Sequence, residues 1–209
     1  MFVQELKYSG SSRVLVWRLE EEVPQLLALC REDGISVEDL LELPAKRQRE
    51  KTVERLLLHR AFGHPATLLH DSKRAPFIED SDVNISITHT MQLVALAIDN
   101  SRIIGLDAEL IDRPQVLRVR DKYLNAKEQR FISPDDLPAH VIAWTAKEAI
   151  IKATRDSAID WTNGISLEPF VADAEETTFM ARCRGNRYSM TARPFEGHFL
   201  TLAVESLAE

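Results

Sequence analysis

The chain has 209 residues, 44% of them hydrophobic and 28% charged, which is typical of a globular protein with one large core or two smaller ones. Its formal net charge of −7 argues against a nucleic-acid partner, because contacts to a phosphate backbone need a basic surface. The start, MFVQELKYSG, is too polar for a signal peptide, and the most hydrophobic run, LVALAI at 93–98, is too short to cross a membrane. We therefore expect a cytoplasmic protein with no membrane partner.

The first half of the chain is predicted to combine strands with one long helix. Apolar residues at helical spacing predict that helix from Lys46 to Gly63, where the glycine ends it. A further helix is expected from Pro24 through Arg31, and SVEDLLEL at 36–43 predicts a short helix capped by Ser36. Three segments are typical of strands, at 13–19, 83–88 and 93–99.

A turn signal, Asp99-Asn100-Ser101, follows the strand at 93–99. The strand is therefore predicted to return as a hairpin into RIIGLDAE at 102–109. Asp107 and Glu109 would lie on one face of that returning strand, since side chains alternate along a strand. Two neighbouring carboxylates are costly unless a cation is present, so the pair raises the question of what it holds.

The second half is predicted to begin with helices and to end as a sheet. Asn125 with Glu128 resembles a capping pair before a short helix, and Pro138 lies near the start of another that runs through Ala153. The last quarter is predicted to be a meander of strands, carried by GISLEPFV, TTFMARC, RYSMTARP and HFLTLAVES.

A faint internal repeat relates the two halves. KTVERLLLH at 51–59 aligns with TAKEAIIKA at 145–153, and LVALAID at 93–99 resembles FLTLAVE at 199–205. An ancient duplication would give two halves of one helix and one sheet each, with a ligand site in the cleft between them. Chance similarity between amphipathic segments is the alternative.

Charged residues in WTAKEAIIKA, at 144–153, are candidates for chemistry. On a helix, Glu148 and Lys152 share a face, and alone they would be read as an exposed ion pair worth a few tenths of a kcal/mol. Beside Asp107 and Glu109, however, Glu148 completes a set of three carboxylates that suits Mg²⁺. The lysine supplies the positive charge that phosphoryl chemistry needs.

The stretch SITHT, at 86–90, ends the strand that precedes these carboxylates. A lone histidine there would usually be structural. With the hydroxyls of Ser86, Thr88 and Thr90 beside it, His89 could instead donate a hydrogen bond to a phosphate.

Three motifs in this order and spacing resemble those of the 4'-phosphopantetheinyl transferases of the larger, Sfp-like, pseudodimeric type. They are Ser86 to Thr90, Gly105-Leu106-Asp107-Ala108-Glu109, and Trp144-Thr145-Ala146-Lys147-Glu148 through Lys152. Three more segments agree with the pattern of this family. They are the basic helix that begins at Lys46, HDSKRAPFI before the first motif, and KYLNAKEQRFI after the second. The resemblance covers about residues 40 to 170.

The resemblance implies an α+β fold of two similar halves, residues 1–100 and 101–209, each an antiparallel sheet packed with a long helix. Coenzyme A would bind in the cleft between the halves. The implied activity is transfer of phosphopantetheine from coenzyme A to a serine of an acyl or peptidyl carrier protein, as in fatty-acid biosynthesis, releasing adenosine 3',5'-bisphosphate. We expect the protein to act as a monomer.

Residue by residue, the resemblance assigns Mg²⁺ to Asp107, Glu109 and Glu148. Glu148 would also be the base for the carrier serine, and Lys152 would stabilise the leaving phosphate. The residues expected to bind coenzyme A are Lys46, Arg47, Lys73, Arg74, Thr88 and His89. The chain departs from the family at two places. Arg74-Ala75-Pro76 stands where the family usually has Gly-Lys-Pro, so Lys73 or Arg74 would substitute for the usual lysine. Thr88 stands where the family usually has a serine.

Two other functions fit parts of the pattern. A coenzyme A or carrier-protein binding module without catalysis would keep the fold, but the intact acidic residues and Lys152 argue against it. A Mg²⁺-dependent nuclease also gathers carboxylates with a lysine, but it would need a basic track for the nucleic acid, and this acidic chain shows no clear one.

Overall fold

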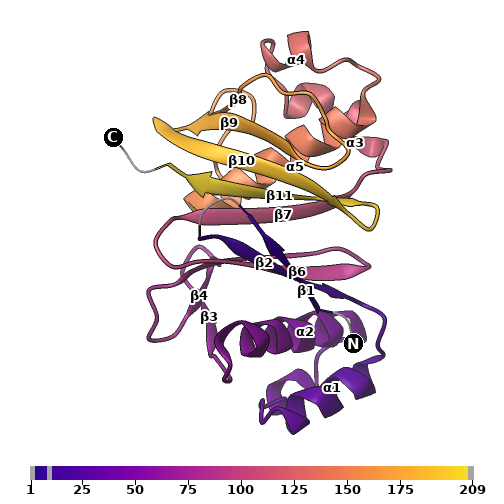
Figure 1. Ribbon diagram of the computed structural model, residues 1–209, viewed down its shortest axis with the longest axis vertical. Coiled ribbons are helices and arrows are strands. Elements are labelled where there is room, and N and C mark those ends of the chain that lie inside the picture. Colours follow the sequence, from indigo (N-terminus) through magenta and orange to yellow (C-terminus); the bar gives the residue numbers. More distant parts are fainter. Residues whose placement is uncertain (1–2, 9–10, 207–209) are drawn as a thin grey trace. The chain divides into compact units, whose positions relative to one another are not determined.

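Two separate antiparallel sheets, each with its own long helix, organise the chain (Figure 1). The computed structural model describes residues 3–8 and 11–206. The chain divides into two units, Met1–Asn100 and Ser101–Glu209. The α+β class with antiparallel sheets, predicted from the sequence, is confirmed.

The first unit contains a four-stranded sheet in the order β1-β2-β6-β5. Its strands are β1 (Val3–Lys7), β2 (Arg13–Arg18), β6 (Leu93–Asp99) and β5 (Asn84–His89). Helix α2 (Ala45–Phe62) packs on this sheet, and α1 (Val23–Glu32) packs on α2. The core includes Trp17, Leu56, Leu57, Val94 and Leu96. Each large apolar side chain buried there contributes about 1.5–3 kcal/mol.

Shorter elements complete the first unit. The segment SVEDLLEL forms only a 3-10 turn, Glu38–Leu40, because Ser36 donates its hydroxyl hydrogen bond to Glu38 and does not cap a longer helix. A two-stranded hairpin, β3 (Leu68–His70) and β4 (Pro76–Ile78), follows α2 and was not predicted, and neither was β1. As expected, α2 ends at Gly63, whose φ of 75° is the left-handed conformation that favours glycine.

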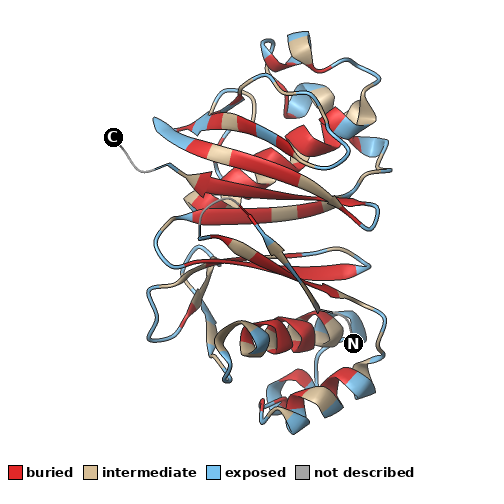
Figure 2. Ribbon diagram, viewed as in Figure 1, coloured by how far each residue is buried: buried red, intermediate tan, exposed pale blue. Residues whose placement is uncertain are grey.

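The second unit contains a five-stranded sheet in the order β7-β11-β10-β9-β8. Its strands are β7 (Ile104–Leu110), β11 (His198–Glu205), β10 (Asn186–Phe195), β9 (Thr177–Cys183) and β8 (Ile165–Leu167). Helix α5 (Leu137–Thr154) packs on β7 and β11 and is mostly buried (Figure 2). Short helical segments lie between β7 and α5, namely α3 (Gln115–Arg118), the 3-10 turn η2 (Arg120–Lys122) and α4 (Glu128–Phe131).

The predicted hairpin from 93–99 into 102–109 is wrong. Both edges of β6 are occupied by β2 and β5, so β6 has no free edge for β7. Instead β7 pairs with β11, with Asp107 opposite Thr201 and Glu109 opposite Phe199. The carboxylate pair therefore does lie on an antiparallel strand, but on one whose partner comes from the end of the chain.

The two sheets have a common pairing pattern. In the first unit the last strand, β6, lies between β2 and β5, and in the second unit the last strand, β11, lies between β7 and β10. In each case the last strand pairs with the strand immediately before it in sequence and with a strand that precedes the long helix. None of the described helices combines the length and apolarity needed to span a membrane.

Candidate active site

Strand β7 and helix α5 approach each other closely because Gly105 has no side chain. A Cβ at this position would overlap the carbonyl oxygen of Ala149 and lie 2.7 Å from the backbone nitrogen of Ala153. A larger residue would therefore push the strand away from the helix. Since Asp107 and Glu109 follow on the same face of the strand, the glycine sets how near they lie to α5.

Helix α5 turns one less-buried stripe toward these carboxylates. Trp144, Glu148 and Lys152 are spaced four residues apart and so share one side of the helix. They are partly buried, whereas most of the helix is fully buried. Trp144, Glu148 and Lys152 thus form one less-buried face on a helix that is mostly core.

Lys152 bridges the helix to the strand. Its Nζ donates to Oδ1 of Asp107 at 2.9 Å and to the backbone oxygen of Leu106 at 2.8 Å. Lys152 therefore pairs with a carboxylate of the neighbouring strand, Asp107, whose side chain is only 13% exposed. This arrangement differs from the exposed pair with Glu148 that was the alternative interpretation of the sequence.

Glu109 is held differently. It forms an ion pair with Arg113, four residues later, and accepts a hydrogen bond from the backbone nitrogen of Leu110 at 2.9 Å. The Arg113 guanidinium lies 5.5 Å from the centre of the Trp144 ring, within the range of a cation–π interaction. Arg113 therefore joins the second carboxylate to the same helix stripe.

Glu148 lies between these pairs with a raised pKa. Burial is the main cause, and the neighbouring negative charge of Asp107 adds to it, while Lys152 and Arg113 act in the opposite direction. Within the described parts of the chain, no protein group donates a hydrogen bond to Glu148. A carboxylate of this kind is suited to accept a proton.

The carboxylates are of the right kind for Mg²⁺. Asp107 and Glu148 are close enough for one to raise the pKa of the other, and a cation between them would relieve that repulsion. Among the described residues, however, no three acidic, histidine or cysteine side chains are gathered as a ready metal site. The side chains of Lys152 and Arg113 neutralise Asp107 and Glu109 instead.

A buried ion pair that the sequence analysis missed fixes α5 beneath this face. The side chains of Lys147 and Glu128 are both fully buried, with Nζ of the lysine 2.7 Å from Oε2 of the glutamate. Lys147 also donates to the backbone oxygens of Tyr123 and Trp161 at 2.5 and 2.8 Å. The sequence could have indicated that Lys147 is buried, because this lysine lies on the apolar side of the predicted helix, beside Ala143 and Ile150.

Glu128 itself is held by the capping pair that the sequence predicted. Its Oε2 accepts from the backbone nitrogen of Asn125 at 2.8 Å, and Oδ1 of Asn125 accepts from the backbone nitrogen of Glu128 at 3.0 Å. The remaining oxygen, Oε1, accepts from the backbone nitrogen of Leu167 at 2.8 Å. One carboxylate therefore connects α4, α5 and the end of β8.

The six predicted coenzyme A residues lie in three places in the first unit. Lys46 and Arg47 are in the first turn of α2 and both face Glu50, at 3.9 and 3.3 Å. Lys73 and Arg74 are exposed in the turn between β3 and β4, where Arg74 has a φ of 65°.

Thr88 and His89 end β5 and lie on opposite faces of it. Thr88 is buried, whereas His89 is partly exposed on the face that carries Ile85 and Ile87 toward the core under α2. His89 Nε2 lies 3.1 Å from Oε1 of Glu54. The hydroxyls of Ser86 and Thr88 are therefore not beside His89, as the sequence interpretation had them, because strand alternation separates them.

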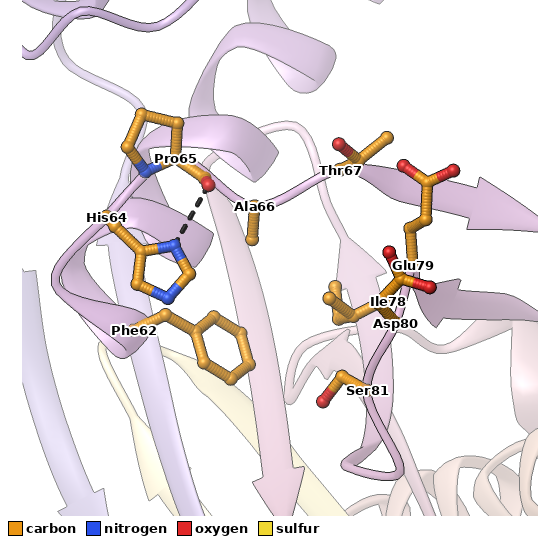
Figure 3. A pocket seen from close by; sticks show the side chains of 9 residues that line it. All are labelled: Phe62, His64, Pro65, Ala66, Thr67, Ile78, Glu79, Asp80 and Ser81. Atoms are coloured by element: carbon orange, nitrogen blue, oxygen red, sulfur yellow. Dashed lines mark hydrogen bonds between the residues drawn. The ribbon is translucent and has the colours of Figure 1, made fainter.

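A cavity of about 370 Å³ lies elsewhere in the first unit, between the end of α2 and β4 (Figure 3). Its lining residues are Phe62, His64, Pro65, Ala66, Thr67, Ile78, Glu79, Asp80 and Ser81. His64 Nδ1 lies 3.0 Å from the backbone oxygen of Pro65. None of the predicted site residues lines this cavity.

Comparison with known protein families identifies the segment that carries the site. Residues 103–200 match the model of the 4'-phosphopantetheinyl transferase superfamily. This segment contains β7, α5 and the carboxylates Asp107, Glu109 and Glu148. The resemblance seen in the sequence is thereby confirmed at the level of the superfamily, for residues 103–200. No curated protein gives a significant match to the chain.

Proposed function

We propose that the protein is an Sfp-like 4'-phosphopantetheinyl transferase that modifies an acyl or peptidyl carrier protein. The observation that carries the proposal is the face shared by β7 and α5, where Glu148, with its raised pKa, lies beside Asp107 and its partner Lys152. This face lies inside the segment that matches the superfamily. A carboxylate base beside a lysine is suited to phosphoryl transfer.

The proposed reaction assigns each side chain a role. Glu148 accepts the proton of the carrier serine as the serine oxygen forms a bond to the phosphorus next to pantetheine. The bond from that phosphorus to the bridging pyrophosphate oxygen breaks, and adenosine 3',5'-bisphosphate leaves. Lys152, which donates to Asp107 and to the Leu106 carbonyl, stabilises the negative charge on the leaving group.

Asp107, Glu109 and Glu148 would hold Mg²⁺ in this proposal. The ion would neutralise charge on the pyrophosphate of coenzyme A when both are bound. Glu109 would then exchange its ion pair with Arg113 for the metal, and Arg113 would keep its place over Trp144.

The first unit would supply further contacts to coenzyme A, through Lys46, Arg47, Lys73, Arg74, Thr88 and His89. The common pairing pattern of β6 and β11 in their sheets supports the proposed duplication of the two halves. It adds to the sequence similarity between 93–99 and 199–205.

Ligand-dependent stability tests the proposed site. Coenzyme A at 100 times its dissociation constant should stabilise the protein by about 2.7 kcal/mol, which for a chain of this size raises the melting temperature by about 5–11 °C. Mg²⁺ should tighten coenzyme A binding, and coenzyme A should tighten Mg²⁺ binding by the same factor. Calorimetric titrations with and without the second ligand measure this coupling. Identical melting curves with and without both ligands would contradict the proposal.

The carrier protein is expected to dock on a basic segment that follows β7. Between Asp112 and Arg130 the positive residues exceed the negative ones, and four of them are exposed, namely Arg118, Lys122, Lys127 and Arg130. Carrier proteins of this class are typically acidic around the modified serine, so opposite charge would speed association. A solvated helical surface without a partner is the alternative reading.

The double substitution Arg118→Glu with Lys122→Glu tests this docking surface. It should raise the KM for the carrier severalfold and leave the KM for coenzyme A nearly unchanged. The effect should shrink as salt rises, because screening weakens attraction between exposed charges. Arg182→Glu with Arg187→Glu is the control, since these exposed arginines lie on β9 and β10. A carrier KM equal to that of the wild type at low salt would place the docking surface elsewhere.

A further inference from the structure

Each carboxylate oxygen of Glu54, in the middle of α2, accepts a hydrogen bond from a different side chain. Oε1 lies 3.1 Å from Nε2 of His89 at the end of β5, and Oε2 lies 2.7 Å from Nζ of Lys51, one turn earlier on α2. The Glu54 side chain is 2% exposed, whereas those of His89 and Lys51 are 32% and 24% exposed. A buried carboxylate thus lies beneath a histidine and a lysine that both reach solvent.

The surroundings of Glu54 favour its ionised form. Burial acts to raise its pKa, but hydrogen bonds from His89 and Lys51 outweigh burial and hold the pKa below the ordinary value. An ionised carboxylate with two donors restricts the rotamers of both donors. Lys51 and His89, which belong to different elements, are therefore held next to each other.

The histidine ring is oriented by this contact. With Nε2–H directed to Glu54, the other ring nitrogen, Nδ1, lies on the opposite side of the imidazole. Nδ1 has no protein partner in the described parts of the chain. When the ring carries both protons, Nδ1–H is free to donate to an oxygen of a bound anion.

We propose that Glu54 is a positioning residue that holds His89 and Lys51 as a paired anion-binding site for a phosphate of coenzyme A. The identity of the anion rests on the function proposed above. A carboxylate alone would repel a phosphate, so Glu54 acts only through the two donors it fixes. Lys51, which has no role in the sequence-based assignment, becomes the second donor of this site.

Calorimetric titration of coenzyme A, without a carrier protein, tests the proposal. E54Q should bind coenzyme A about tenfold more weakly, because a glutamine amide can accept from only one of the two donors. The matched control is D33N, since Asp33 also faces a histidine in this unit, with His59 Nε2 at 3.9 Å and Arg60 at 3.5 Å. D33N should bind coenzyme A as the wild type does. Wild-type affinity in E54Q would overturn the proposal.

A double-mutant cycle separates positioning from a merely structural role. If Glu54 acts through its donors, adding E54Q to a variant that already carries H89Q and K51M should weaken coenzyme A binding little further. Losses of coenzyme A affinity that add fully would contradict the proposal. Should E54Q fail to fold, a cycle between H89Q and K51M replaces it. Because one carboxylate holds both donors, the double variant should lose less coenzyme A affinity than the sum of the two single losses.

Imidazole ¹⁵N–¹H spectra give a result that does not depend on transfer activity. The Nε2 proton of His89 should be protected from exchange in the wild type and in D33N, and should exchange faster in E54Q. Failure of the wild type to bind coenzyme A would overturn the proposed function, while this proton would still report on the role of Glu54. Equal protection in E54Q and the wild type would overturn the positioning role.

Discussion

Glu148→Gln is expected to lower the rate of phosphopantetheine transfer by about 10²–10⁴-fold, the usual contribution of a general base. The substitution also removes one of the three carboxylates proposed for Mg²⁺, while the side chain keeps its size. Turnover measured with saturating coenzyme A, carrier protein and excess Mg²⁺ checks the result. Glu175→Gln, an exposed carboxylate in the same unit, is the control and should keep wild-type turnover. Near wild-type turnover in Glu148→Gln would show that the proposed site is wrong.

The same substitution should not destabilise the ligand-free protein. Because the pKa of Glu148 in the folded state lies above its ordinary value of 4.5, its contribution to stability is fully present below that value and is lost as the pH rises through the folded-state pKa. At pH 7 with EDTA, Glu148→Gln should therefore melt at or above the temperature of the wild type. That advantage should disappear as the pH falls toward 4.5. A lower melting temperature at pH 7 would contradict the environment described for Glu148.

Lys147→Met is expected to cause the largest loss of stability, about 3–5 kcal/mol, because it leaves a buried carboxylate without its counter-ion. Both side chains of the pair are fully buried, so water cannot replace the lysine without local opening. Chemical denaturation of the ligand-free protein, followed by circular dichroism, measures the change in the free energy of unfolding.

A second substitution distinguishes an unpaired charge from lost packing. Glu128→Gln in the Lys147→Met background removes the buried charge but keeps an oxygen that can accept from the backbone nitrogen of Leu167. The double variant should recover at least half of the lost stability. If it is no more stable than Lys147→Met, the loss comes from packing and not from the unpaired carboxylate.

The sequence predicted those parts of the fold that depend on local periodicity. The helical spacing gave α2 with its end at Gly63 and α5 with Pro138 near its start, and both are confirmed. The strand pattern of the last quarter is confirmed as β8 to β11. The spacing of Asn125 and Glu128 predicted a cap that the structure contains.

Pairings between distant segments could not be read from local patterns. A turn signal after residue 98 favoured a hairpin, but β7 pairs with β11, near the end of the chain, since β6 is already paired on both edges. Similarly, helical spacing favoured Glu148 as the partner of Lys152. The close approach that Gly105 allows brings Asp107 to Lys152 instead.

The sequence predicted which residues form the candidate site, but it did not predict the contacts that support them. Alternation placed Asp107 and Glu109 on one strand face, and helical spacing placed Glu148 and Lys152 on one helix face. The link from Glu109 through Arg113 to Trp144 depends on the path of the chain after β7, which no spacing rule gives. The pairing of His89 with Glu54 joins a strand end to a helix interior and is equally invisible in sequence.

Intact-mass spectrometry of an apo carrier protein tests the proposed transferase most directly. The carrier is incubated with this protein, coenzyme A and Mg²⁺, and a panel of fatty-acid, polyketide and peptide carriers covers the possible partners. We predict a mass increase of one phosphopantetheine group on the serine of at least one carrier, and none when Glu148→Gln replaces the wild type. Binding of coenzyme A and of a carrier with no mass change in any member of the panel would contradict the account and indicate a binding module without catalysis.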